Sequence, residues 1–229
     1  MMLGKILFLG LSGIDGSGKS TIIKFLRRHL KERGFDVNVK WFGSRTILSH
    51  VVYVYAYFAR YTKTVINPRC NAIANIHKFY LSPVLKNLYP WTFFIDMVAS
   101  YLLLRFRLFF SLSRRKVIIY DRFLVDALAN LMYMTRRKDL LNTMISKVFL
   151  RVATSLDIIV YLDVLPGTAY ERKDDITSLN ELKFKSIVLA GIYDSMDNVL
   201  VVNANRELKH VLEDVISNID LLIQTEMKG

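Results

Sequence analysis

A glycine-rich loop near the start of the chain places the tightest limit on the fold. The residues Gly13-Ile14-Asp15-Gly16-Ser17-Gly18-Lys19-Ser20 match the pattern G-x-x-x-x-G-K-[ST]. An apolar run, Ile6 to Leu11, precedes the loop, and an amphipathic stretch from about Lys19 to Gly34 follows it. This order of strand, loop and helix is the context in which the pattern forms a phosphate-binding loop, or P-loop. We therefore expect a buried strand, a P-loop and a helix.

The residue types in the loop explain how it would hold a nucleoside triphosphate. Glycines let the backbone turn tightly beside the phosphates, and the backbone N–H groups and the helix N-terminus attract anions. Lys19 would reach the β- and γ-phosphates of ATP, and the Ser20 hydroxyl would bind Mg²⁺. The expected ATP-binding residues are Gly13, Ile14, Asp15, Gly16, Ser17, Gly18, Lys19, Ser20 and Thr21. The alternative is a glycine turn without a ligand.

Four more segments read as buried strands: Val37 to Phe42, Val117 to Tyr120, Asp157 to Asp163 and Val199 to Val202. Helical patterns separate them, which indicates βαβ units and a parallel sheet covered on both sides. We therefore expect an α/β protein with three layers, in which helices flank a five-stranded parallel sheet that carries the P-loop. The chain has 229 residues without a repeat or linker, so residues 1–229 are expected to form a single domain.

The middle of the chain, Ile47 to Leu112, is helical in character and rich in Tyr and Phe. Breaks are expected at Asn67-Pro68, Ser82-Pro83 and Tyr89-Pro90. The stretch Trp91 to Leu112 resembles a membrane span in its apolar character, but Asp96, Arg105 and Arg107 interrupt it. We expect a buried or partner-facing helix there, with an interfacial membrane helix as the alternative.

An acidic residue should complete a nucleotide site at the end of a neighbouring strand. Asp121 follows the apolar run Val117 to Tyr120 and is expected to hold the metal through a water; its alternative role is a helix N-cap. Arg122 follows at once, where a side chain faces the ligand crevice of a parallel sheet. Its planar guanidinium suits the phosphate of an acceptor. The alternative is a surface ion pair with Asp126.

The net charge and the cysteine content limit which partners and which compartment we expect. Lys and Arg exceed Asp and Glu by 12, and the pI is about 9.7, which suits phosphorylated ligands, nucleic acid, an anionic membrane or a merely basic solvated face. The basic residues form only short runs at expected helix ends, so nucleic acid is not favoured, and neither is peripheral membrane contact. Cys70 is the single cysteine, and the first apolar run is too short for a signal peptide. A cytoplasmic location is therefore expected.

The chain resembles the thymidylate kinases, within the P-loop nucleoside monophosphate kinases. Four parts carry the resemblance: Gly13 to Thr21; Tyr120-Asp121-Arg122-Phe123; Tyr161 to Pro166 with Ala169 to Lys173; and Val202 to Arg206 with Val211 to Val215. The resemblance implies transfer of a phosphoryl group from ATP to a nucleoside monophosphate, nominally thymidylate to thymidine diphosphate, with Mg²⁺. It also implies a homodimer through the long helices. The implied catalytic residues are Lys19, Asp15, Arg122 and Arg172, the last with Lys173 in a mobile lid at about 170–182.

The resemblance is weakest in the acceptor-binding region, about residues 43–112. The family's Arg-Glu-Pro-Gly type segment is replaced by Lys40 to Thr46, where Arg45 is expected to supply the arginine and Gly43 a close backbone approach. The family's Asp-Arg pair on the long helix falls on Ala99-Ser100, so Asp96 is the acid expected there. Arg45, Asp96 and Arg122 are thus the expected acceptor-binding residues. Two alternatives stay open: a kinase for a lipid- or sugar-linked phosphate, and a nucleotide-binding protein with little catalytic activity.

Overall fold

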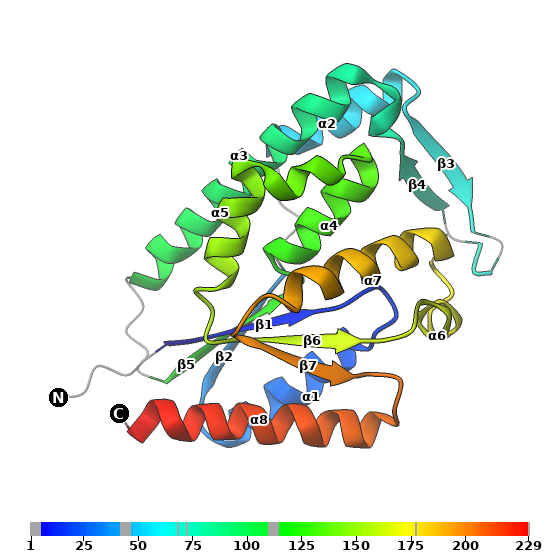
Figure 1. Cartoon of the computed structure of the whole chain (residues 1–229). Coiled ribbons are helices and arrows are strands. Elements are labelled where there is room, and N and C mark those ends of the chain that lie inside the picture. The colour runs from blue at the N-terminus through cyan, green and yellow to red at the C-terminus, as the bar shows by residue number, and fades with distance from the viewer. Residues whose placement is uncertain are drawn as a thin grey trace.

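The protein has an α/β fold built on a five-stranded parallel sheet. A computed structural model describes residues 6–41, 47–67, 69–71, 73–109, 115–176 and 178–228. The sheet order is β2-β5-β1-β6-β7 (Figure 1). The strands are β1 Ile6–Ser12, β2 Asp36–Trp41, β5 Lys116–Asp121, β6 Ile158–Asp163 and β7 Val199–Asn203. All five expected strands and their parallel arrangement are therefore confirmed.

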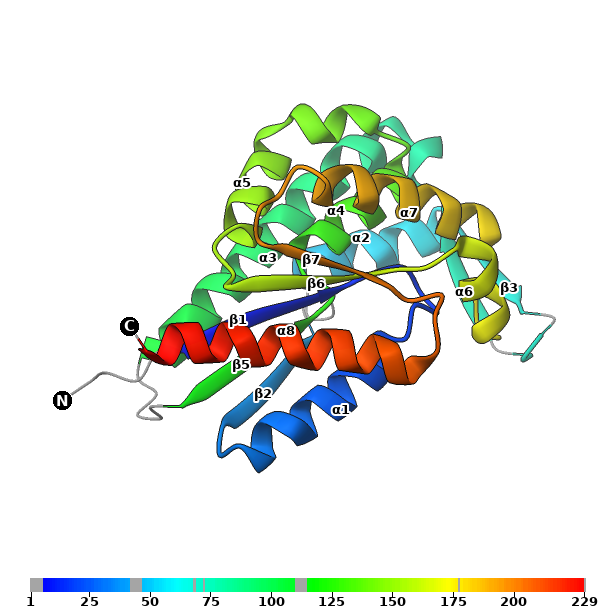
Figure 2. The ribbon, with the colours of Figure 1, turned by 60° about the horizontal axis from the view of Figure 1, so that its bottom comes forward.

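Helices cover both faces of the sheet, which explains why its strands read as continuous apolar runs. Below the sheet in Figure 1 lie α1 (Lys19–Glu32) and α8 (Leu208–Lys228), and Figure 2 shows both from below. Above it lie α3 (Pro83–Phe109), α4 (Leu124–Thr135), α5 (Met144–Ala153) and α7 (Leu179–Tyr193). Val117, Ile118 and Ile119 of β5 are fully buried between the two helical layers. The short helix α6 (Pro166–Arg172) lies beyond the carboxyl ends of the strands.

The region expected to be helical contains a β-hairpin. After α2 (Ile47–Phe58), the chain forms the antiparallel strands β3 (Thr62–Ile66) and β4 (Ile73–His77), and then a 3-10 turn at Phe79–Leu81. The break expected at Asn67-Pro68 falls in the hairpin turn, but the strands themselves were not predicted. Each has only five residues, too few to show a clear alternation. The β-branched residues of β3 were the one available signal.

The break expected at Tyr89-Pro90 is wrong, because Pro90 lies inside α3. A proline in a helix interior costs about 3 kcal/mol through the lost N–H and the clash with the preceding turn. Here tertiary packing offsets that cost: Tyr89 and Phe93 on either side of Pro90 are buried, and the Tyr89 ring lies 4.6 Å from that of Phe79. Core burial has overridden the local preference.

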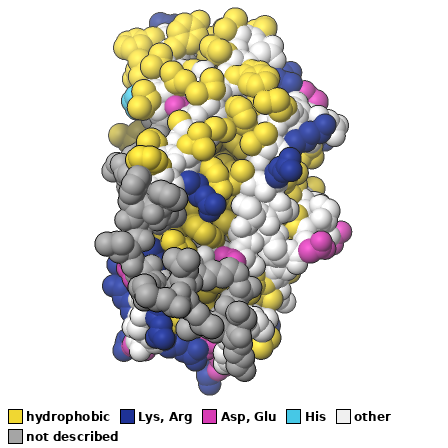
Figure 3. Space-filling model, turned by 90° about the vertical axis from the view of Figure 1, so that its left-hand side faces the viewer, with side chains coloured by type: hydrophobic (Ala, Val, Ile, Leu, Met, Phe, Trp, Pro, Cys, Tyr) yellow, Lys and Arg dark blue, Asp and Glu magenta, His cyan; other side chains and the backbone are white. Residues whose placement is uncertain are grey.

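An apolar surface covers α2 and α3, which pack along each other. Within the described part of the chain, neither these helices nor any other is long and apolar enough to cross a bilayer. The exposed apolar side chains include Ile47, Val51, Val54, Tyr55 and Phe58 of α2, and Leu88, Trp91, Ile95, Leu102 and Leu103 of α3. Figure 3 shows hydrophobic side chains over much of the upper part of the face on which α3 lies. A patch of this extent on one side of a protein is typical of an interaction surface.

Candidate functional site

The glycine-rich loop connects the carboxyl end of β1 to the first turn of α1. Gly16 has a φ of +84°, and a Cβ atom there would lie 2.2 Å from the carbonyl oxygen of Ala169 in α6. Gly13 has a φ of +142°, and its Cβ would lie 2.7 Å from Ser17 Oγ. Both the backbone conformation and the close packing against α6 therefore require glycine. No side chain caps α1 within the described structure, so its first N–H groups face the loop.

Lys19 folds back over the loop that precedes it. Its Nζ donates to the carbonyl oxygens of Gly13 (2.6 Å) and Ile14 (2.7 Å) and to Ser17 Oγ (3.2 Å). The side chain is buried, and desolvation together with the nearby Arg122 lowers the pKa of Lys19 to about 8. A buried ammonium held only by neutral oxygens would be stabilised strongly by an anion in the loop. The structure thus brings the predicted lysine to the predicted anion site.

Arg122 lies directly after β5 with a φ of +58°, a left-handed conformation that is uncommon outside glycine. Its amide donates to the carbonyl oxygen of Leu11 (3.1 Å), and its guanidinium forms an ion pair with Asp15 of the loop. The alternative pairing with Asp126 is therefore not the one observed. Burial alone would raise the pKa of Asp15, but Arg122, Lys185 and Lys19 together lower it to about 2. Backbone strain at such a residue is a common feature of functional sites.

Asp126 joins the loop to the start of α4. Its Oδ1 accepts from Ser12 Oγ (3.0 Å) and the Gly13 amide (3.4 Å), and its Oδ2 accepts from the Phe123 amide (3.2 Å). Desolvation raises the pKa of Asp126 although these bonds, Lys19 and Arg122 favour the ionised form. From the sequence, Asp126 was expected only as an alternative partner for Arg122. An acidic residue in the first turn of a helix was the signal for this capping role.

Asp121 ends β5 with one carboxylate oxygen in need of a partner. Its Oδ1 is buried and has no hydrogen-bond partner among the residues that the structure describes. The alternative role as a helix N-cap is wrong, because α4 starts at Leu124 with Phe123 at the N-cap. A buried carboxylate oxygen normally binds a donor, a water or a metal. Asp121 and the exposed Ser20 hydroxyl therefore fit the expected Mg²⁺ role, in which few protein ligands and several waters are usual.

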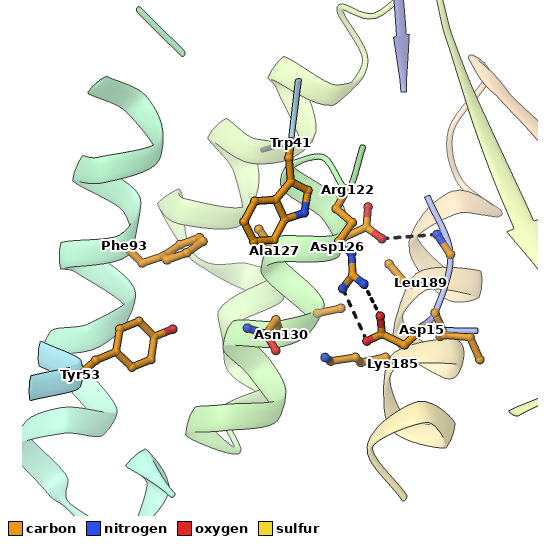
Figure 4. A pocket seen from close by; sticks show the side chains of 13 residues that line it. Asp15, Trp41, Tyr53, Phe93, Arg122, Asp126, Ala127, Asn130, Lys185 and Leu189 are labelled. Atoms are coloured by element: carbon orange, nitrogen blue, oxygen red, sulfur yellow. Dashed lines mark hydrogen bonds and ion pairs between the residues drawn. The ribbon is translucent and has the colours of Figure 1, made fainter. Parts of the chain in front are cut away.

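A cavity opens beside the loop, and its two ends differ in chemistry (Figure 4). Asp15, Arg122 and Lys185 lie at one end, Tyr53 and Phe93 lie at the other, and the Trp41 ring lies between Arg122 and Phe93. The wall between them comes from α4 and α7 and consists of Ala127, Ala129, Asn130 and Leu189. The centres of water-sized molecules can occupy about 150 Å³ of the space. An aromatic end and a charged end suit a ligand with a flat apolar part and an anionic group.

Lys185 belongs to the charged end of this cavity but was missed in the sequence. Its Nζ lies 2.5 Å from Glu181 Oε1, one turn earlier on α7, and its side chain is 12% exposed. A Glu and a Lys four residues apart on a helix are usually a solvated surface pair. Nothing in the local pattern distinguishes this pair from such a case, because the cavity forms only when α7 packs beside the loop.

The two other predicted acceptor-binding residues, Asp96 and Arg45, are not part of the described lining of the cavity. Asp96 is buried, and its carboxylate accepts from the amides of Leu48 (3.1 Å) and Ser49 (2.7 Å). It therefore caps the first turn of α2 and does not line the cavity. Arg45, like Gly43, lies outside the described residues.

The predicted lid residues also lie away from the cavity. Arg172 ends α6, and its Nη1 donates to the carbonyl oxygen of Ala204 (2.8 Å), while Lys173 pairs with Asp175 (3.0 Å). Neither residue lines the cavity. The structure thus brings together Lys19, Asp15 and Arg122 of the predicted catalytic set, and leaves Arg172 at the end of α6, where it binds the backbone just after β7.

The β3–β4 hairpin clamps the segment that follows α6. Arg69 Nη1 donates to the Tyr170 carbonyl oxygen (2.5 Å), its Nη2 pairs with Asp174 (2.8 Å), and its guanidinium lies 4.6 Å from the centre of the Tyr170 ring. Asn67 Nδ2 donates to the Asp174 carbonyl oxygen (2.8 Å). A distant cation therefore satisfies the carboxyl end of α6. The hairpin connects the acceptor region to the predicted lid at 170–182.

Within the described ranges, no group of three or more His, Cys, Asp or Glu side chains is arranged to hold a metal ion. A search against models of known protein families found no family whose model matches this chain.

Proposed function

We propose that the protein is a kinase of the P-loop kinase fold that transfers the terminal phosphoryl group of ATP to the phosphate of a nucleoside monophosphate, nominally thymidylate. One observation carries the proposal: the Asp15–Arg122 ion pair links the glycine-rich loop to a cavity with an aromatic end. A donor site and an acceptor site for phosphate thus share one boundary. The resemblance of the loop and of Tyr120-Asp121-Arg122-Phe123 to thymidylate kinases supports the same assignment.

On the donor side, the loop supplies backbone N–H groups, the end of the α1 dipole and the Lys19 ammonium. Lys19 would exchange its three loop oxygens for the β- and γ-phosphate oxygens of ATP. Mg²⁺, when bound by Ser20 and by Asp121 through water, would neutralise charge on the same phosphates. An acceptor phosphate is already ionised, so the chain needs no general base, and its task is to position the two phosphates in line.

On the acceptor side, Arg122 is the side chain suited to the phosphate. Its left-handed backbone directs the guanidinium across the end of β1 toward Asp15 (Figure 4). The side chains of Trp41, beside Arg122, and of Phe93, farther along the cavity, could contact a planar base. Asn130, which lies between the two ends, could exchange hydrogen bonds with an acceptor. This division favours a nucleotide over a sugar phosphate, because a planar base needs few hydrogen-bond partners at an aromatic end, whereas each hydroxyl group of a sugar ring needs one.

The test is an acceptor screen with ATP and Mg²⁺, in which ADP formation is measured for a panel of nucleoside monophosphates, sugar phosphates and a polyprenyl phosphate. We expect the largest stimulation with a nucleoside monophosphate. Faster turnover with the lipid- or sugar-linked phosphate would support the second kind of acceptor instead. Tight ATP binding without transfer to any acceptor would support a nucleotide-binding protein with little catalysis. Lys19→Ala, which should abolish all transfer, is the control for contaminating kinases.

We also infer a homodimer through α2 and α3, which rests on the family resemblance and on the apolar surface of these helices. The charge substitution Val51→Glu should shift the protein toward the monomer in sedimentation equilibrium, whereas an equally exposed position on α8, Leu221→Glu, should not. A monomeric wild-type protein at micromolar concentration would contradict the dimer. The single exposed Cys70 suits a reducing compartment, and we place the protein in the cytoplasm.

A further inference from the structure

The Asp15 carboxylate occupies the edge of the Arg122 guanidinium that carries Nη1 and Nη2, an edge suited to binding two phosphate oxygens side by side. When an acceptor anion takes the guanidinium, the Asp15 carboxylate loses its main partner. Its side chain is only 24% exposed, and it would then lie near a second anion. A largely buried carboxylate without a partner beside a like charge is costly. Productive binding therefore requires a second cation for Asp15.

Lys185 meets this requirement. It lines the same end of the cavity as Asp15 and Arg122, from a different element, α7 (Figure 4). Lys19 is the other cation near Asp15, but the loop oxygens and then the donor phosphates occupy it. Lys185 is held by Glu181, whose side chain is 30% exposed. Glu181 can therefore be hydrated when the lysine leaves it.

We propose that Lys185 is a positioning residue that replaces Arg122 as the partner of Asp15 when Arg122 turns to the acceptor anion. The inference rests on the proposed function, since it concerns the same acceptor site. It adds a basis for selectivity: a neutral acceptor gives Arg122 no reason to leave Asp15, so the exchange of partners favours acceptors that carry a phosphate over uncharged alcohols.

Steady-state kinetics of Lys185→Gln test the proposal, with Lys183→Gln as the matched control on the exposed side of the same helix. We expect the KM for the acceptor to rise about tenfold in Lys185→Gln, with the KM for ATP unchanged. Lys183→Gln should behave as the wild type. Lys185→Arg should restore most of the acceptor KM, because it keeps the charge. An unchanged acceptor KM in Lys185→Gln, or a failure of Lys185→Arg to restore a raised one, would overturn the inference.

A double-mutant cycle with Asp15→Asn separates this role from direct contact with the acceptor. If Lys185 acts through Asp15, the further substitution Lys185→Gln should change the acceptor KM by less than about twofold in the Asp15→Asn background. An effect of Lys185→Gln as large as in the wild type would show that the lysine acts independently of Asp15.

Binding of inorganic phosphate, measured with the glycine-rich loop saturated by ADP, distinguishes failure of this inference from failure of the proposed function. The chain has two tryptophans, so Trp91→Phe leaves Trp41, which lines the cavity, as the only indole reporter. Phosphate affinity that falls in Lys185→Gln, together with no transfer to any acceptor, would overturn the proposed function alone. Equal phosphate affinity with and without Lys185 would overturn the inference alone. Absence of phosphate binding to the wild type would overturn both.

Discussion

The glycine-rich loop and the cavity beside it share Asp15, yet they are built in opposite ways. The loop is a contiguous run of eight residues, Gly13 to Ser20, whose backbone supplies most of the binding groups. The cavity is assembled from side chains on β2, α2, α3, α4 and α7, and only its boundary with the loop is local in the chain. Changes in the loop should therefore abolish ATP binding. Changes in the cavity should instead alter which acceptor is used and how tightly that acceptor binds.

The largest effect is expected in the loop, from Gly16→Ala. The left-handed backbone costs about 1–2 kcal/mol, and the overlap of the new Cβ with the Ala169 carbonyl oxygen adds about 1–3 kcal/mol of strain. We expect ATP binding to be undetectable by titration calorimetry. The matched control is Gly34→Ala, which has a φ of +83° but no atom within 4 Å of the new Cβ. It should lose about 1 kcal/mol of stability and keep ATP binding; equal damage in both variants would refute the packing argument.

The second largest effect is expected from Arg122→Met, at the boundary between the loop and the cavity. We expect kcat/KM for the acceptor to fall roughly 100-fold, on the order of 3 kcal/mol, because a phosphate and Asp15 both lose their arginine. The affinity for ATP should change little, since the loop remains intact. Arg122→Lys should recover only part of the activity because it cannot bind two oxygens side by side. A parallel loss of ATP affinity would show that the two regions are not separable at this residue.

The third largest effect is expected on the pH dependence of ATP binding, which involves the glycine-rich loop and not the cavity. The pKa of Lys19 is lowered to about 8 from an ordinary value of 10.5, so the free protein loses this charge above pH 8. ATP requires the charged form, and its affinity should therefore be constant below pH 8 and fall by up to tenfold per pH unit above it. The exposed Lys24→Gln on the same helix should keep this profile, and Lys19→Gln should lose it. A flat profile in the wild type would contradict the burial argument.

The smallest effect is expected from the hairpin that joins the acceptor region to α6. Arg69→Ala removes the ion pair with Asp174 and the bond to the Tyr170 carbonyl oxygen, both at the surface. We expect about a threefold loss in kcat/KM and faster hydrogen exchange over residues 170–176. The neighbouring Cys70, the single cysteine, allows a fluorophore on the hairpin to report the same loosening. Lys63→Ala on β3 is the control, and unchanged exchange in Arg69→Ala would argue against the clamp.

The fold and the donor loop could be read from the sequence because their signals are local. Apolar runs mark β1, β5 and β6, and the glycines and Lys19 occupy fixed offsets in one turn. The hairpin and Pro90 show where this fails: each segment has a weak or adverse local preference, and contacts with distant residues such as Phe79 decide its structure. The capping of α2 by Asp96 could not be read from the sequence for the same reason, since it depends on how two helices pack.

By itself, the sequence determined the α/β class, the five strands of the parallel sheet and the residues of the glycine-rich loop. These features leave short-range patterns, because they depend on local backbone geometry and on burial of the strands on both faces of the sheet. Only the tertiary structure decided that Arg122 pairs with Asp15, that Asp126 joins the loop to α4, and that Lys185 enters the cavity. Arg122 and Asp15 are 107 residues apart in the chain, and Asp126 and Gly13 are 113 apart, while the place of Lys185 depends on how α7 packs beside the loop. Long side chains have several partners within reach, and only the folded chain selects among them.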